Sequence, residues 1–276
     1  MVRWMLLVVL LAFATGIVAA DVDNGETPEN PLPARYAKKF SLNEPMYFSV
    51  GWRGDTNARF QISFRYRFVG TDNGGSLADA LIGHTYFGFT QVSFWDLGAS
   101  SSPFRDTSYR PSLFYFKPDI RRNWLGARRV GLQAGFEHES NGRDGDSSRS
   151  VNILFVRPVM TFGDPAGYVL TLAPKMWFYI GDLSDNPDIQ DYRGYFQFLV
   201  RYEKADSWGF ATYLRKGTRR KCGSVEFDAS YPLDRLLHKR FDSYLHLQYF
   251  NGWGESLLDY NIKSKAQIRL GLMVVR

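Results

Sequence analysis

Side chains capable of chemistry cluster in one short segment, His138-Glu139-Ser140-Asn141-Gly142. Before it, apolar residues occupy every second position, at Val130, Leu132, Ala134 and Phe136. Continuing the same parity reaches His138 and Ser140. Because successive residues of a β-strand face opposite sides, an imidazole and a hydroxyl would lie together on the apolar face, where the strand gives way to a polar loop.

This spacing suits activation of a serine nucleophile, because it lets a His138 nitrogen approach the Ser140 hydroxyl. Asn152 lies in the following predicted strand and shares the parity of Leu154 and Val156, so it can face the same side. A neutral residue that orients the histidine would complete a Ser-His-Asn arrangement. The alternative is that His138 and Ser140 are ordinary rim residues at the level of the lipid headgroups.

Period-two alternation recurs along the chain. Between Phe60 and Phe68, aromatic and aliphatic side chains take one parity, and Gln, Ser and Arg take the other. One face of such a strand suits lipid and the other suits water, and strongly charged inner faces argue against the core of a soluble sandwich. Aromatic residues form 16% of the sequence. After the N-terminus, no apolar run approaches the roughly 18 residues of a membrane helix.

Turn signals divide this pattern into about twelve predicted strands. They are 46–53, 59–69, 83–97, 112–119, 129–140, 147–162, 166–180, 191–203, 208–217, 221–232, 241–251 and 264–275. An even number is typical of single-chain bacterial barrels. The predicted fold is therefore all-β, a transmembrane antiparallel β-barrel over residues 46–276. The segment 163–167 is predicted as a short periplasmic turn, whereas 141–147 and 182–191 are predicted as outer loops.

The N-terminus predicts export. Residues 1–20 contain Arg3, an apolar run and a Val-Ala-Ala end, as in a secretory signal peptide, and residues 21–45, with Pro28, Pro31 and Pro33, are predicted to form an irregular lead. The single cysteine, Cys222, excludes an internal disulfide. The net charge of +6 is spread along the chain without an ordered basic stripe, so nucleic acid is not expected as a partner.

Five separated motifs occur in order. They are GFTQ at 88–91, SSPFRDTSY at 101–109, HESNGR at 138–143 with SSRS at 147–150 and Asn152, DNPD at 185–188, and GESLLDYN at 254–261. In these motifs the chain resembles the outer membrane phospholipase A family. The resemblance implies a bacterial outer-membrane enzyme that hydrolyses phospholipid acyl esters in a calcium-dependent manner, with phospholipase A1, phospholipase A2 and lysophospholipase activities.

The resemblance also implies a role for individual residues. Ser140 would be the nucleophile, His138 the general base and Asn152 the residue that holds the histidine ring, with the Gly142 backbone N–H forming the oxyanion hole. The implied calcium ligands are the Arg143 carbonyl, Ser148, Asp185 and Ser101, the last from a second subunit. The implied active form is therefore a homodimer, with Gln91 at its interface in the membrane.

Two other functions fit a barrel of this size. A passive outer-membrane channel would need only the polar inner faces, and a structural or adhesive barrel would use its outer loops to bind a partner. Neither function explains why His138, Ser140 and Asn152 share the outer face. Hydrolysis of a phospholipid analogue, with and without a calcium chelator, would distinguish the enzyme from both alternatives.

Overall fold

The structure is a computed structural model that describes residues 39–53, 55–69, 82–237 and 242–276. The predicted signal peptide (1–20) and most of the predicted irregular lead (21–45) lie outside these residues. The strands are β1 (Phe40–Leu42), β2 (Met46–Arg53), β3 (Asp55–Arg67), β4 (Thr85–Asp96), β5 (Phe104–Trp124), β6 (Ala127–Ser140), β7 (Ser150–Gly163), β8 (Val169–Ile180), β9 (Phe196–Glu203), β10 (Gly209–Lys216), β11 (Gly223–Pro232), β12 (Tyr244–Gly252) and β13 (Ser264–Val275).

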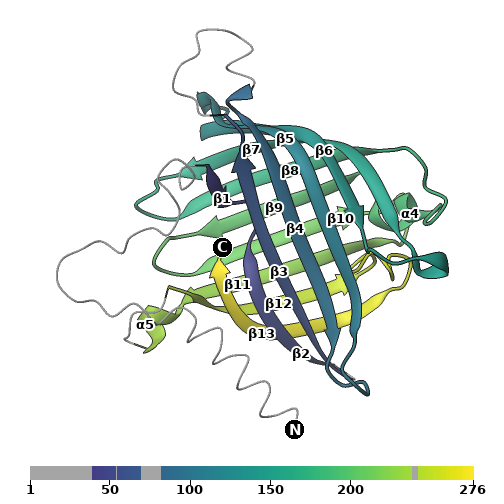
Figure 1. Cartoon of the computed structure of the whole chain (residues 1–276). Helices are drawn as coiled ribbons and strands as arrows, with labels where there is room; N and C mark the ends of the chain where they lie inside the picture. Colours follow the sequence, from purple (N-terminus) through teal and green to yellow (C-terminus); the bar gives the residue numbers. More distant parts are fainter. Residues whose placement is uncertain (1–38, 54, 70–81, 238–241) are drawn as a thin grey trace. The chain divides into compact units, whose positions relative to one another are not determined.

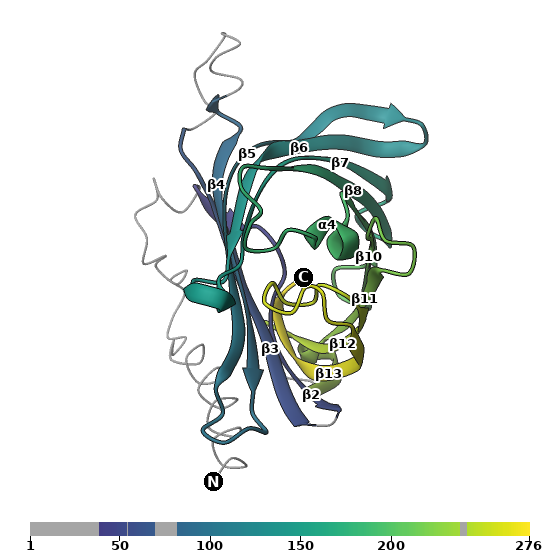
Figure 2. The same ribbon diagram turned by 90° about the vertical axis from the view of Figure 1, so that its right-hand side faces the viewer.

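Strands β2 to β13 form a closed antiparallel wall. Each strand pairs with its neighbour in the sequence, and β13 pairs with β2, so the twelve strands close on themselves. Figures 1 and 2 show the strands wrapping around a common interior. In the part of the chain that the structure describes, no helix is both long and apolar enough to cross a membrane. The predicted twelve-stranded barrel is confirmed.

Three strands differ most from the alternation pattern. The strand predicted at 191–203 begins only at Phe196, because Ile189–Arg193 forms the short helix α4. β1 lies in the range predicted to be irregular, but it pairs with β3 beyond the start of β2, and the Phe40 ring lies 5.8 Å from Phe64 and 5.2 Å from Tyr66. β5 was predicted only over 112–119. Its flanks carry Arg, Asp and Pro, which the pattern reads as loop, yet β4 and β6 supply hydrogen-bonding partners for them.

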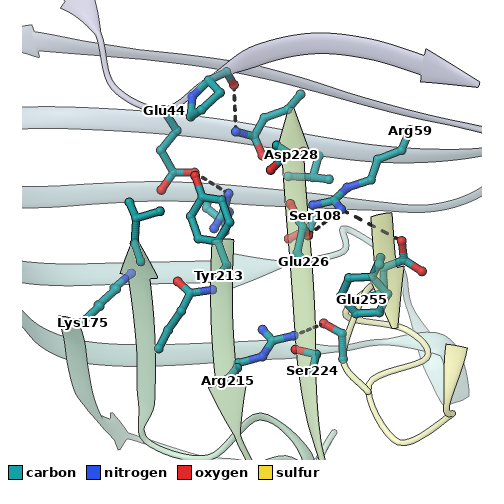
Figure 3. A pocket seen from close by; sticks show the side chains of 18 of the residues that line it. Glu44, Arg59, Ser108, Lys175, Tyr213, Arg215, Ser224, Glu226, Asp228 and Glu255 are labelled. Carbon is teal, nitrogen blue, oxygen red and sulfur yellow. Dashed lines mark hydrogen bonds and ion pairs between the residues drawn. The ribbon is translucent and has the colours of Figure 1, made fainter. Parts of the chain in front are cut away.

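The two faces of the wall have opposite chemistry. The outer face exposes large apolar side chains, as at Leu113, Leu154 and Phe178. The inner face carries ion pairs, among them Arg59 with Glu226 at 2.7 Å. Figure 3 shows labelled members of this network around an interior cavity of about 160 Å³. Charged side chains therefore occupy much of the space that a wide channel would need.

One buried network joins three strands of the inner face. His246 Nε2 donates to Asp228 Oδ1 at 2.8 Å, and His246 Nδ1 lies 2.8 Å from Ser49 Oγ. Gln248 Nε2 also donates to Asp228 Oδ1, at 3.1 Å. His246, Ser49 and Gln248 have no solvent exposure. Asp228 is thus the shared acceptor for two buried donors, and Gln248 Nε2 has a second, longer bond to Glu226 Oε1 at 3.5 Å.

Replacing Asp228 with alanine is expected to destabilise the barrel by roughly 2 to 4 kcal/mol, because the buried His246 Nε2 loses its acceptor and Gln248 Nε2 keeps only its longer bond to Glu226. The measurement is the free energy of unfolding from urea titration in lipid vesicles. The matched control is Asp206→Ala, which removes an exposed ion pair with Arg235 and should cost less than about 1 kcal/mol. Equal losses for the two variants would contradict a stabilising role of the inner network.

Candidate active site

His138 and Asn152 face each other across the β6–β7 pair. His138 Nδ1 lies 2.8 Å from Asn152 Oδ1. A carbonyl oxygen can only accept, so Nδ1 carries the proton and Nε2 is left as the basic nitrogen of the neutral ring. Leu154 and Phe136, which share this face, are exposed. The predicted orientation of His138 and Asn152 toward the outside of the wall agrees with this geometry.

Ser140 ends β6, where it pairs with Ser150 on one side and with Tyr109 on the other. The Gly142 N–H donates to Ser140 Oγ at 3.2 Å. Gly142 has φ of +66°, and a Cβ there would lie 3.3 Å from the Tyr109 ring, so only glycine fits without strain. Among the hydrogen bonds of the described residues, none joins His138 to Ser140. Catalytic hydrogen bonds are often long in an enzyme without substrate.

Asn141 organises the loop that follows Ser140. Its side chain is 4% exposed and donates from Nδ2 to the Ser147 carbonyl at 2.8 Å. Its Oδ1 accepts from the backbone N–H groups of Arg149, at 3.0 Å, and of Arg143, at 3.3 Å. One buried amide therefore fixes the backbone around Gly142 and Arg143. Sequence analysis gave Asn141 no role, although it lies inside the HESNGR motif.

Glu139 lies between His138 and Ser140 in sequence but points to the inside of the wall. Ser108 Oγ donates to it at 2.6 Å, and Arg193 Nη1 donates at 2.9 Å from α4 (Ile189–Arg193). Burial alone would lower the pKa of Arg193, but the Glu139 carboxylate raises it above its ordinary value. The ion pair therefore stays charged and ties the end of β6 to α4.

The loops beside this site form a small apolar cluster at the same end of the barrel. Ile189 and Leu257 are fully buried in it, together with Val151 and Tyr260. Tyr260 donates to Asp188, and burial followed by this neighbouring carboxylate raises its pKa. Segments 185–188 and 254–261, which are remote in sequence, thus meet on the inner side of β7.

The predicted calcium ligands are only partly brought together. Ser148 Oγ donates to Asp185 Oδ2 at 2.7 Å. Arg143 follows Gly142 in the same loop as Ser148, and its guanidinium donates to the Arg105 carbonyl at 2.6 Å. Ser101 is an exposed residue of the β4–β5 loop. The described residues contain no group of three or more His, Cys, Asp and Glu side chains placed to hold a metal.

The loop that carries Ser101 has an unusual backbone. Ser101 has φ of +62° and Ser102 has φ of +42°, a left-handed conformation that costs on the order of 1 kcal/mol for such residues. Hydrogen bonds maintain it: Trp95 Nε1 donates to the Ser102 carbonyl at 2.7 Å, and the Ser102 N–H donates to the Ala99 carbonyl at 3.0 Å. Ser101 is therefore held in an ordered, exposed position.

Gln91 is half-buried and lies at the level of Ser140 on the wall. It pairs with Ile62 on β3 and with Tyr109 on β5, and Tyr109 in turn pairs with Ser140. Gln91 Nε2 donates to Ser93 Oγ at 3.2 Å. The residue predicted to hold a dimer together is thus separated from Ser140 by one strand.

A second Ser-His-acid chain lies in the barrel interior, formed by Ser49, His246 and Asp228. No sequence pattern links these residues, because Ser49 lies 197 positions from His246 and reaches it only through closure of the barrel. Since the Ser49 hydroxyl and the His246 ring are both fully buried, a membrane lipid has no access to them. This chain of hydrogen bonds therefore belongs to the inner stabilising network.

Comparison with known proteins places the chain among phospholipases. A family model described as phospholipase A1 matches residues 29–274. The phospholipase A1 of Escherichia coli is 32% identical over 248 residues, covering 87% of this chain and 78% of that protein. A putative phospholipase A1 of Neisseria meningitidis is 33% identical over 230 residues, covering 81% of this chain, but the match spans only 56% of that longer relative.

Two solved structures have the same fold. The outer membrane phospholipase A of E. coli matches with a TM-score of 0.72 and 26% identity, covering 88% of this chain and 96% of that one. The outer membrane phospholipase of Salmonella typhi, solved as a dimer with bound calcium, also gives a TM-score of 0.72, with 26% identity and 90% and 94% coverage. The chain belongs to the phospholipase A1 family, the outer membrane phospholipases A of bacteria.

Proposed function

We propose that this outer-membrane protein hydrolyses phospholipid acyl esters, acting as a phospholipase A1, a phospholipase A2 and a lysophospholipase, with Ser140, His138 and Asn152 as its catalytic triad. The 2.8 Å hydrogen bond between His138 and Asn152 on the outer face carries the proposal. Polar side chains on a lipid-facing surface cost free energy. A paired imidazole and amide beside a serine on such a surface therefore indicate a functional site.

The proposed reaction has two steps. Ser140 Oγ attacks the ester carbonyl while His138 Nε2 takes its proton, and the imidazolium then gives that proton to the leaving alcohol. Water next attacks the acyl-serine with His138 again as base, which releases the fatty acid and restores Ser140. Asn152 holds the ring in the required tautomer throughout. The Gly142 N–H, which points at Ser140 Oγ in the resting protein, would donate to the oxyanion.

We propose that calcium binds beside this site, held by the Arg143 carbonyl, Ser148, Asp185 and Ser101 of a second subunit. These groups are oxygen donors, which calcium prefers. The contact between Ser148 and Asp185 already places a hydroxyl and a carboxylate together. When bound, calcium would supply positive charge near the developing oxyanion. The calcium-bound dimer of the Salmonella relative supports the proposal.

A dimer is therefore proposed as the active form. The ordered, exposed Ser101 suits a residue presented to a neighbour. Gln91 would join the two subunits in the membrane, because its amide lies on the outer face where lipid offers no hydrogen-bonding partner. The short distance along the wall from Gln91 to Ser140 means that a partner docked at β4 would also lie close to the active site.

The channel function fits the inner face less well. Ion pairs lie in the interior, such as Arg110 on β5 with Glu44 of the β1–β2 connection, at 2.8 Å, and Lys175 on β8 with Glu137 on β6, at 3.0 Å. Their charged groups fill space that a wide pore would leave to water. A purely structural barrel would need neither the His138–Asn152 pair nor the Gly142 turn.

Ser140→Ala and His138→Ala should each reduce hydrolysis of a thioester phospholipid analogue by several orders of magnitude while the barrel stays folded. Asn152→Ala should have a smaller effect, because nucleophile and base remain. Ser150→Ala is the matched control, since it removes a half-buried serine hydroxyl paired with Ser140 across the strands. Near wild-type turnover by Ser140→Ala, or failure of a sulfonyl fluoride to label Ser140, would refute the triad.

Activity should require both calcium and dimerisation, so that loss of either one reduces it. Gln91→Ala should weaken the dimer by about 1 kcal/mol, roughly fivefold in its association constant, and activity should fall in parallel on dilution into detergent. Ser101→Ala should raise the calcium concentration needed for half-maximal activity. Gln197→Ala, in the interior cavity lining, is the control for loss of an amide. A chelator-treated monomer with full activity would contradict this coupling without affecting the triad.

A further inference from the structure

The helix α4 lies in the connection between β8 and β9 and ends at Arg193. The helix is attached to the β10–β11 loop, because the Thr218 N–H donates to the Gln190 carbonyl at 3.0 Å. A Cβ at Gly254 would lie 2.7 Å from Arg193 Cγ, so the loop before β13 packs directly on the stem of the arginine. Arg193 is thus held by segments that are remote from it in sequence.

The Arg193 guanidinium binds Glu139 through both of its terminal nitrogens. Nη1 donates to Glu139 Oε2 at 2.9 Å, and Nη2 donates to Oε1 at 3.3 Å. Ser108 Oγ on β5 donates to Oε1 at 2.6 Å. The side chains of Glu139 and Arg193 are only 10% and 14% exposed. A two-pronged bond of this kind fixes the direction of the carboxylate as well as its position.

The backbone ladder of β6 is interrupted on its β5 side at this level. β5 pairs with β6 at Glu137 and again at Ser140. Within the described strands, no β5 residue pairs with the two positions in between, His138 and Glu139. Pro111 lies in this stretch of β5 and has no N–H to donate. The bonds of the Glu139 carboxylate to β5 and α4 therefore supply an attachment that the ladder lacks.

The ion pair controls how the end of β6 is turned. Successive side chains of a strand point to opposite faces, so a rotation of the strand at Glu139 would swing both outward neighbours of the proposed triad. Arg110 lines the same cavity, but it is bound to Glu44 at 2.8 Å. Among the described residues, Arg193 is the cation that forms an ion pair with Glu139. Its loss would leave a buried carboxylate without its counter-charge, which favours such a rotation.

We propose that Arg193 is a positioning residue, which acts through Glu139 to hold His138 and Ser140 in the geometry that acyl transfer needs. Arg193 lies on the inner side of the wall and contacts no reacting atom. The inference rests on the proposed triad, because it assigns no new reacting group. A displacement of about 1 Å at the reacting atoms can cost on the order of a hundredfold in rate, so a small rotation of β6 would be enough.

The test uses the whole barrel in micelles and the variant R193M, which keeps a long side chain but removes its charge and its donors. We expect kcat for the thioester phospholipid analogue, and the rate at which a sulfonyl fluoride labels Ser140, to fall about tenfold. KM should not change, because lipid binds to the other face of the wall. R193K, which keeps the charge, should recover most of the loss. E139Q/R193M should lose no more than R193M, because the two side chains act through one contact.

A spectroscopic measurement separates this inference from the triad. The Nδ1 proton of His138, which is bound to Asn152, can be followed by NMR in the isotopically labelled barrel whether or not the protein hydrolyses lipid. In R193M this proton should exchange with water faster than in wild type. Unchanged exchange would overturn the positioning role, whereas activity that persists in Ser140→Ala would overturn the triad alone.

The matched control is R219Q, which removes the ion pair between Arg219 and Asp191 of the same helix, 3.2 Å long. R219Q should keep wild-type kcat, labelling and proton exchange. The inference is overturned if R219Q slows labelling as much as R193M, since that would indicate a general loosening of α4. It is also overturned if folded R193M labels at the wild-type rate. If R193M does not fold, as judged by its electrophoretic mobility, E139Q/R193M takes its place, because that variant leaves no unpaired charge at the contact, and full activity would again contradict the inference.

Discussion

The structure depends on one constraint: lipid offers no partner to a backbone N–H or C=O, so every strand of the wall must be paired on both edges. Pairing of β13 with β2 meets that requirement by closure. Closure then fixes the two faces, because alternate side chains must point to lipid or to the interior. The apolar outer face and the ion-paired interior are both consequences of the same ring of backbone hydrogen bonds.

The active-site region uses both faces of one strand. His138 and Ser140 point outward from β6, while Glu139, between them, points inward to Ser108 and Arg193. Residues that face lipid have few groups available to position them, whereas the interior supplies charged and polar partners. The inner network therefore anchors β6 from inside the barrel, and the Asn141 side chain fixes the loop that follows Ser140. A surface site in a membrane is made rigid by contacts that the lipid never reaches.

Sequence alternation located all twelve strands of the wall because each must keep one apolar face. It failed at β1 and at the ends of β5, where a strand is defined by its partners more than by its own pattern, and at the start of β9, where the short helix α4 replaces the predicted strand. The facing of His138 and Asn152 followed from parity alone. The bonds from Glu139 to Arg193 and from Ser49 to His246 could not be predicted, since the first joins β6 to a helix 54 residues away and the second joins strands that only closure of the barrel brings together.

The β2–β13 pairing also has a consequence for how the protein acquires its structure. It joins segments that stand more than 200 residues apart in the sequence, so it is the least local strand pairing of the wall. Until this pairing forms, the sheet has two open edges, each able to pair with a foreign strand. The polypeptide must therefore be shielded during its transit, and the seam between β2 and β13 is where assembly is most exposed to error.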